Sequence, residues 1–176
     1  MSFVNAHFVA YATDAGIPTG TAAVVLGSVG GSSVAGAIAF GYLADRFGRR
    51  LMLTIGYLLR GLAYGVLVMA GSVPMMLAGV LLIGVSWTTV ISLTGSYSAE
   101  RFGDRRLGTI YGAMYSVMPI GSALGVWLAG RLYDRYGSYD IALISSMFVG
   151  LGAAVVVGLP AFSRRRRRPG GRLSVE

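Results

Sequence analysis

The chain has 176 residues, of which 55% are hydrophobic and only 12% are charged, and its mean hydropathy is +0.67. Soluble domains carry about 25% charged residues, so this composition excludes an ordinary water-soluble domain and indicates a lipid-facing protein. Because the chain has no cysteine and one histidine, disulfides, thiolate metal sites and histidine clusters are excluded as well. The sequence predicts no metal and no cofactor.

Five apolar stretches are each long enough to cross a hydrocarbon core of about 30 Å. They are predicted at 22–44, 51–70, 75–97, 107–133 and 140–162. A shorter apolar stretch at 1–11 makes about half a span. The prediction is therefore an all-α, multi-pass membrane bundle over residues 1–162, followed by a basic tail at 163–176.

The arginines are distributed unevenly between the two ends of these spans. All fifteen basic residues are arginine; twelve lie at 45–50, at 98–106 and in the tail, while Arg131 and Arg135 lie at the other side. The positive-inside rule predicts that the twelve-arginine side and the C-terminus are cytoplasmic in the cell membrane. A net charge of +8 also suits nucleic acid, but arginines beside a span favour anionic lipid. The lipid bilayer is the expected partner, and nucleic acid is not.

One phrase occurs twice in the chain, 89 positions apart. Both copies read Gly-x-Leu-x-Asp-Arg-aromatic-Gly, at 41–48 and at 130–137. Three predicted spans lie between the copies, which places them on opposite sides of a bilayer. This pattern predicts an inverted three-plus-three repeat, a construction known from secondary transporters. The residues of the first motif copy are Gly41, Asp45, Arg46, Gly48, Arg49 and Arg50, and those of the second are Gly130, Asp134, Arg135 and Gly137.

Asp45 lies at a predicted helix end, where a carboxylate can accept hydrogen bonds from the free N–H groups of another helix. Arg46, Arg49 and Arg50 can pair with Asp45 or with lipid phosphates. Taken by themselves, these residues fit a topology anchor that never moves.

The run from Gly41 to Arg50 resembles the cytoplasmic signature of the major facilitator superfamily. The resemblance implies that this motif is a conformational latch, which holds one state and breaks in the other. The acid within a basic cluster favours the latch over the topology anchor. The stretch 7–16 is similar to the outer end of helix seven in monocarboxylate-transporter-like members, and 130–139 to the end of their helix eleven. The resemblance implies helices seven to twelve of that fold, with helix seven truncated, and a complementary N-terminal six-helix half as partner. Ala37 and Ser33 stand where that branch carries charged residues, which predicts poor transport of simple monocarboxylates.

The resemblance also suggests a substrate cavity. Its candidate residues are His7, Tyr11, Arg60, Trp87, Thr88, Tyr111 and Tyr115. Arg60 stands at the centre of a predicted span, where a charge must face protein or water; an anion site and a structural pairing are both open. The aromatic residues recur at helical spacing, so packing is the alternative to ligand contact. Glycines four apart, at 27 and 31, 61 and 65, and 121 and 125, predict close helix contacts.

No catalytic arrangement is found, because all seven acidic residues are predicted in loops or at the terminus. An enzyme is therefore not expected. The predicted function is secondary active transport of a small solute, with an organic anion as the expected class, by alternating access as part of a larger transporter. The alternative is a membrane-embedded structural or regulatory fragment that transports nothing.

Overall fold

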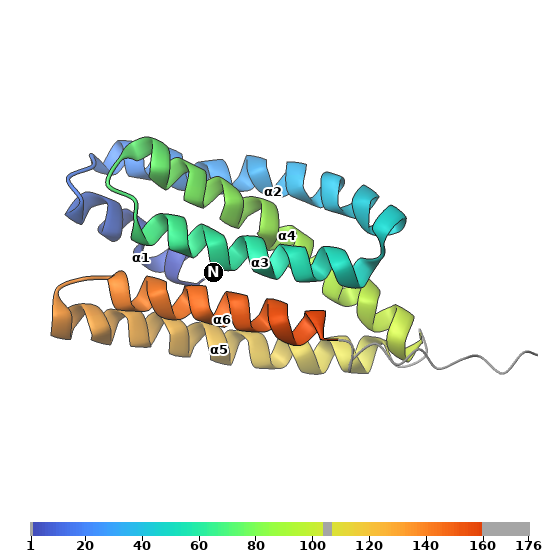
Figure 1. Cartoon of the computed structure of the whole chain (residues 1–176). Coiled ribbons are helices and arrows are strands. Elements are labelled where there is room, and N and C mark those ends of the chain that lie inside the picture. The colour runs from blue at the N-terminus through green and yellow to red at the C-terminus, as the bar shows by residue number, and fades with distance from the viewer. Residues whose placement is uncertain (1, 104–106, 160–176) are drawn as a thin grey trace, which may run out of the picture.

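The computed structural model describes residues 2–103 and 107–159, and all regular structure in these ranges is α-helical. The helices follow one another along the chain (Figure 1). They are α1 (Ser2–Asp14), α2 (Thr19–Phe47), α3 (Arg49–Val68), α4 (Val73–Phe102), α5 (Leu107–Tyr136) and α6 (Asp140–Gly158). Helices α2 to α6 are long and apolar enough to cross a membrane. The predicted all-α membrane fold is confirmed.

Glycine determines where four of the helices stop. Gly16, Gly48, Gly103 and Gly137 follow α1, α2, α4 and α5, and all four have a positive φ, a conformation that glycine adopts without strain. The polar residues before these glycines stay helical. The expectation that acidic residues occupy loops is therefore wrong for five of them. Four lie in or beside the last turn of a helix, namely Asp14, Asp45, Glu100 and Asp134. The fifth, Asp140, is the first residue of α6.

The helices consequently extend beyond the predicted spans at their charged ends. The predicted loop at 45–50 is reduced to Gly48, because α3 begins directly at Arg49. Helix α4 continues through the predicted loop at 98–106 as far as Phe102. The rest of that loop and the predicted basic tail lie outside the described residues.

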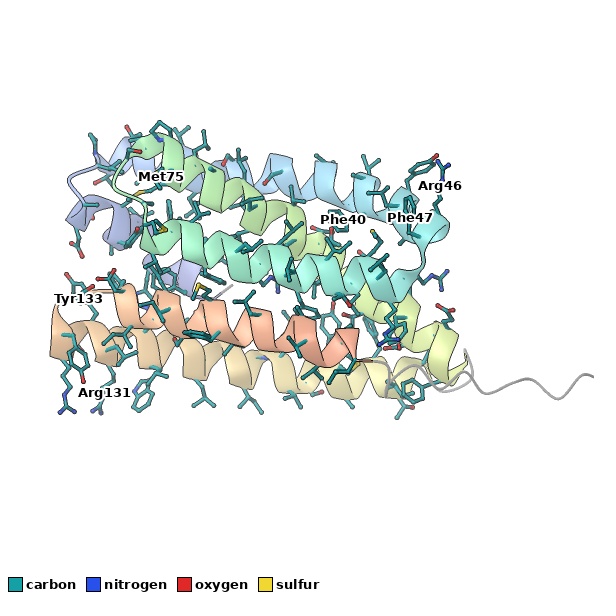
Figure 2. The ribbon with its side chains drawn as sticks, in the orientation of Figure 1. Phe40, Arg46, Phe47, Met75, Arg131 and Tyr133 are labelled. Carbon is teal, nitrogen blue, oxygen red and sulfur yellow. The ribbon has the colours of Figure 1, made fainter. Side chains whose placement is uncertain are left out.

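The helices pack in a continuous series. Helix α2 packs against α4, α4 against α3, and α3 against α6, while the short α1 contacts α2 and α5. Figure 2 shows Arg46 and Phe47 at one end of the bundle, and Arg131 and Tyr133 at the other. The two motif copies thus lie at opposite ends, as their separation by three spans requires.

Two glycine positions allow the closest approaches between helices. A Cβ at Gly36 of α2 would overlap the carbonyl of Val85 in α4. A Cβ at Gly150 of α6 would lie 3.0 Å from the Cα of Gly61 in α3. Backbones can approach this closely only where side chains are absent, so these glycines fix the spacing of α2 with α4 and of α3 with α6.

The predicted small-residue contacts are found at one pair of glycines and not at the others. Gly61 and Gly65 pack against Leu151 and Met147 of α6. The other pairs, at 27 and 31 and at 121 and 125, have no atom within 4 Å of the place a Cβ would take. The expectation of close contacts at those two pairs is wrong for the described residues, because helical spacing alone does not say which face meets a partner.

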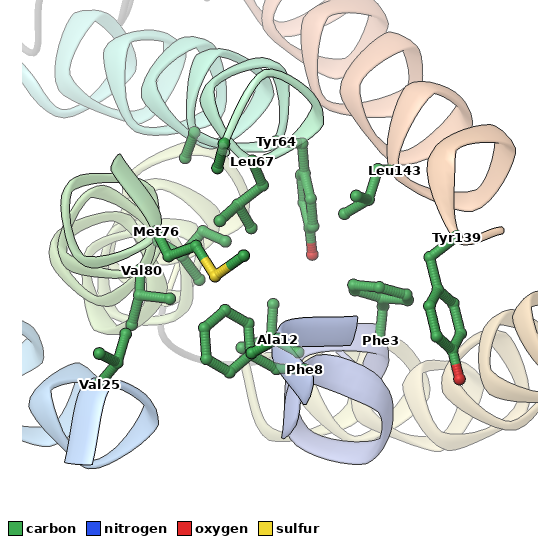
Figure 3. Packing of buried hydrophobic residues seen from close by; sticks show 14 of the residues in the cluster. Phe3, Phe8, Ala12, Val25, Tyr64, Leu67, Met76, Val80, Tyr139 and Leu143 are labelled. Carbon is green, nitrogen blue, oxygen red and sulfur yellow. The ribbon is translucent and has the colours of Figure 1, made fainter. Parts of the chain in front are cut away.

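The main apolar core lies where α1 meets the ends of α3, α4 and α6 (Figure 3). Phe8, Leu67, Met76 and Leu143 are fully buried there. Helix α5 contributes little to it, since Ala129 is its buried residue. In the most apolar stretch of this helix, 6% of the residues are buried. Most of α5 therefore has an apolar surface that faces lipid or another helix.

Candidate functional site

The first motif copy, at the end of α2, holds three helices together through its last two arginines. The Arg49 guanidinium donates to the Ser96 carbonyl of α4 at 3.1 Å. Arg50 donates to the carbonyls of Val157 at 3.0 Å and Gly158 at 2.7 Å, and also to that of Leu159. These are the last carbonyls of α6, which lack partners within their own helix, and a positive charge there is favoured by the helix dipole.

The acid of this motif lies in the last turn of α2, and a pair with the motif arginines was one of its possible contacts. Asp45 is exposed, and among the described residues no ion pair joins it to Arg46, Arg49 or Arg50. Arg46 is exposed as well and lies over the ring of Phe47 at 5.9 Å. Arg49 and Arg50 thus donate their hydrogen bonds to backbone carbonyls within the bundle. The Asp45 carboxylate is available to a group from outside the described helices.

The second motif copy, at the end of α5, has different contacts. Asp134 and Arg135 are exposed, and Arg135 lies over the ring of Tyr136 at 5.8 Å. The chain then continues with Ser138 and Tyr139 where the first copy has arginines. The Ser138 hydroxyl accepts a hydrogen bond of 3.0 Å from the Asp140 N–H at the start of α6. This copy therefore lacks the guanidinium links of the first.

Tyr139 joins α1 to the loop between α5 and α6. A hydrogen bond of 3.3 Å connects its hydroxyl to Nδ1 of His7, whose Nε2 lies 3.3 Å from the Val126 carbonyl of α5. Its ring stacks on Tyr133 at 4.4 Å. Burial raises the pKa of the Tyr139 phenol, and the nearby carboxylates of Asp14 and Asp134 raise it further, so the hydroxyl keeps its proton and the hydrogen bond.

The aromatic cluster around Tyr139 contains Tyr133 and two of the seven predicted cavity residues, His7 and Tyr11. The Tyr11 hydroxyl donates to the Leu67 carbonyl at the end of α3, and its ring lies 6.5 Å from that of Tyr139. Both side chains therefore have structural partners. Tyr139 itself was not among the predicted site residues; its place after the second motif copy was the signal that could have identified it.

Tyr111 and Tyr115 form a second group near the start of α5. Their rings lie 4.8 Å apart, and the Tyr111 hydroxyl donates to the Ile91 carbonyl of α4 at 3.3 Å. Tyr111 also lies against Gly95. Tyr115 is exposed. The pair therefore connects α4 to α5 through Tyr111 and leaves Tyr115 free to contact a solute or another helix.

Arg60 has a separate environment at the centre of α3. Its Nη2 donates to the Ser86 carbonyl of α4 at 3.1 Å, while its Nε is buried and has no partner among the described residues. The side chain lines a cavity of about 450 Å³ between α3, α5 and α6. Ser86 was missed by sequence reasoning, because a backbone acceptor carries no signal in its side chain.

Trp87 and Thr88 follow Ser86 on α4 and are half-buried. Their neighbour Thr89 is the buried residue, and its hydroxyl donates to the carbonyls of Val85 at 2.7 Å and Gly36 at 3.4 Å. The seven predicted cavity residues thus fall into separate groups. No hydrogen bond or ring contact between described residues joins the His7 cluster, Arg60 and the tyrosine pair.

The comparisons with known proteins identify the family. The family model of the Major Facilitator Superfamily matches residues 1–176. The chain belongs to this superfamily. Monocarboxylate transporter 12 of Rattus norvegicus is 26% identical over 166 residues, which cover 92% of this chain and 34% of that protein. No solved structure matches the chain.

Other relatives of the chain have different names. The uncharacterized MFS-type transporter YcxA of Bacillus subtilis is 27% identical over 166 residues, covering 88% of this chain and 39% of that protein. The multidrug efflux pump Tap of Mycobacterium bovis is 26% identical over 134 residues, which cover 76% of this chain and 32% of that protein. The chain spans about a third of the length of these relatives. Membership of this superfamily confirms two expectations: the chain is a multi-pass membrane protein, and it belongs to a family of transporters and not of enzymes.

Proposed function

We propose that the chain forms the C-terminal half-bundle of a secondary active transporter, which moves a small solute across the cell membrane by alternating access. The observation that carries this proposal is the placement of two related motifs at opposite ends of one bundle in a chain of this superfamily. An inverted repeat builds one wall of a central pathway, and a second bundle supplies the other wall. The partner is a complementary six-helix half.

An organic anion is the proposed class of solute, because a relative over most of the chain is named as a monocarboxylate transporter. Ser33 donates to the Gly84 carbonyl of α4 at 3.1 Å, and Ala37 has no charge to offer. Simple monocarboxylates such as lactate are therefore expected to be poor substrates unless Arg60 or the other half provides a positive charge.

The first motif copy is proposed to act as a latch between the two halves. Its arginines at 49 and 50 donate to backbone carbonyls of α4 and α6, while the exposed Asp45 carboxylate has no cationic partner among the described residues. A helix N-terminus of the complementary half would offer Asp45 free N–H groups and the positive end of a dipole. Breaking that contact when the halves rock apart would let the pathway open to the cytoplasm.

Reconstitution in liposomes tests the proposal. The 176-residue chain alone is expected to give no saturable uptake of radiolabelled aromatic and aliphatic organic acids, because one bundle supplies one wall of the pathway. Co-reconstitution with a complementary half is expected to restore uptake. Saturable flux from the chain alone would contradict the half-transporter. If no pairing gives flux, the chain is instead a membrane-embedded structural or regulatory fragment that transports nothing.

In the paired system, Asp45→Asn is expected to reduce the initial uptake rate about tenfold, which corresponds to losing ~1.4 kcal/mol. The matched control is Asp134→Asn in the second motif copy, which is equally exposed. Insertion is checked by the yield of folded protein in the membrane. Equal uptake rates for Asp45→Asn and the unmodified chain would contradict the latch and would favour the topology anchor that does not move.

A further inference from the structure

One face of α5 is uncovered from the middle of the helix to the end that carries the second motif copy. Its residues are three or four positions apart, which places them on one side of a helix: Val117, Ile120, Leu124, Trp127 and Arg131. The four apolar side chains are 58% to 66% exposed, and Arg131 is exposed as well. Helix α5 lies at the edge of the bundle beside α6 (Figure 1), and Figure 2 shows Arg131 directed away from the other helices. We call this surface the Arg131 face.

The side chain of Arg131 lies over an aromatic ring. Its guanidinium carbon is 5.1 Å from the centre of the Trp127 ring, and it has no hydrogen bond or ion pair with another described residue. A guanidinium has five N–H donors in a planar fork, and stacking on a ring leaves the donors at its edge unused. Such a fork binds the oxygens of a phosphate in pairs, so the end of the Arg131 face is suited to a phosphate group.

The first motif copy shows that the fold itself does not require this arrangement. Ile38 and Tyr42 of α2 stand 89 positions before Trp127 and Arg131, the spacing that separates the two copies. They are similarly exposed, at 71% and 67%, but they carry no positive charge. A surface that contacts only acyl chains needs no cation at this position. Trp127 and Arg131 therefore indicate a ligand that is particular to the second copy.

The charges around Arg131 determine which headgroup fits best. Asp134 and Arg135 follow about one turn later and are both exposed, and Arg135 lies over the ring of Tyr136. No ion pair joins Asp134 to either arginine among the described residues. Two arginines against one aspartate leave this end of α5 positive, and arginines beside a membrane attract anionic lipids.

The apolar part of the face matches the thickness of one lipid leaflet. From Ile120 to Arg131 the helix rises about 16 Å, and half of a hydrocarbon core of about 30 Å is about 15 Å. A lipid phosphate at Arg131 therefore leaves its acyl chains beside Trp127, Leu124 and Ile120. Tryptophan is enriched at this depth, at the level of the headgroups.

We propose that the Arg131 face binds an anionic phospholipid, with the phosphate on the Arg131 guanidinium and an acyl chain along Trp127, Leu124 and Ile120. A free phosphate ion would occupy the arginine and leave the apolar side chains uncovered. A phospholipid supplies the phosphate and the apolar cover in one molecule. This site is independent of the transport proposed above.

Quenching of Trp127 fluorescence by brominated lipids tests the site. Trp87→Phe leaves Trp127 as the reporter, because the chain has two tryptophans. The full chain is reconstituted in phosphatidylcholine vesicles that contain an equal minor fraction of brominated phosphatidylglycerol, phosphatidylethanolamine or phosphatidylcholine. The matched reporter is Trp87 of α4 in a Trp127→Phe variant.

Brominated phosphatidylglycerol is expected to occupy the surroundings of Trp127 about fivefold more often than brominated phosphatidylcholine, the size expected for one arginine at an anionic lipid surface. Trp87 is expected to show no such preference. Arg131→Gln is expected to remove the preference at Trp127. Arg46→Gln is the matched control, because it removes an exposed arginine that lies over a ring at the opposite end of the bundle, and it is expected to leave the preference unchanged.

Four outcomes overturn the proposal. Equal quenching by phosphatidylglycerol and phosphatidylcholine means that the face is an ordinary lipid-contacting surface. A preference that survives Arg131→Gln means that the net charge of the chain attracts the lipid, without a site at Arg131. Stronger quenching by phosphatidylethanolamine than by phosphatidylglycerol assigns the face to a zwitterionic headgroup held by Arg131 and Asp134. If a co-reconstituted complementary half shields Trp127 from all brominated lipids, the face is a contact between the two halves.

Discussion

Three arginines follow one another closely where α2 ends and α3 begins, yet they have different surroundings. Arg46 is exposed beside Phe47, whereas Arg49 and Arg50 reach carbonyls of α4 and α6. The difference arises from the break at Gly48, whose φ of 96° turns the chain back into α3. Residues after the turn therefore point across the bundle, and the one before it points to solvent or headgroups.

Replacing Arg50 is expected to destabilise the bundle. Arg50→Gln removes donors from the last carbonyls of α6, and hydrogen bonds to a charged group contribute about 1.5–3 kcal/mol, less here because the side chain is half-exposed. We expect a loss on the order of 1 kcal/mol and a lower melting temperature in detergent. Arg46→Gln is the matched control and is expected to leave the melting temperature unchanged. Equal melting temperatures for the two variants would refute the proposed contribution of Arg50.

The residue scale also shows the limit of prediction from sequence. The two motif copies can be found in the sequence, because glycine, aspartate and arginine recur in a fixed pattern. Their contacts cannot. Pairing of Asp45 with the neighbouring arginines was one possibility and is absent among the described residues, whereas Arg50 donates to carbonyls about 107 positions away. Backbone acceptors exist at every residue, so no side-chain pattern indicates which of them an arginine will reach.

At the scale of the helix, glycines separate into those that pack and those that do not. Helix α2 contains both kinds: Gly36 lies against the Val85 backbone, and Gly27 has open space where a side chain would begin. A side chain at Gly36 must push α2 away from α4. A side chain at Gly27 meets nothing, and alanine has a higher helix propensity than glycine by about 1 kcal/mol.

The same substitution in one helix is therefore expected to have opposite effects at the two sites. Gly36→Ala is expected to lower stability by about 1–3 kcal/mol through overpacking. Gly27→Ala is expected to be neutral or to raise stability by up to about 1 kcal/mol. Thermal unfolding in one detergent measures both variants. A Gly36→Ala variant as stable as the original chain would contradict the close approach of α2 and α4.

The helices themselves were largely predictable, since apolar length identifies a membrane span without knowledge of its neighbours. Their ends and faces were less so. The charged residues at 45–50 suggested a loop, but a helix tolerates them near its end and the glycine conformation decides where it stops. Glycine spacing predicted contacts on α2 and α5 that the structure does not have, while Gly36 and Gly150, which do make contacts, were not singled out.

At the scale of the whole molecule, the two ends of the bundle differ in charge. The junction of α2 and α3 carries Arg46, Arg49 and Arg50. The end of α5 carries Arg131 and Arg135, at the opposite side of the bundle (Figure 2). From the count of spans, the sequence predicts that the remaining arginines of 98–106 and of the tail are on the same side of the membrane as the first of these ends. Orientation by positive charge therefore predicts that the end of α2 faces the cytoplasm.

This prediction can be tested with two substitutions in a chain that has no cysteine of its own. Arg46→Cys and Arg135→Cys introduce thiols at exposed positions at the two ends of the bundle. An impermeant maleimide added to intact cells is expected to label the Arg135→Cys variant and to leave Arg46→Cys unlabelled until the cells are lysed. Each substitution removes one arginine, which leaves most of the charge difference between the ends in place. Labelling of Arg46→Cys in intact cells would reverse the orientation, and it would move Asp45 and its proposed latch to the outer face.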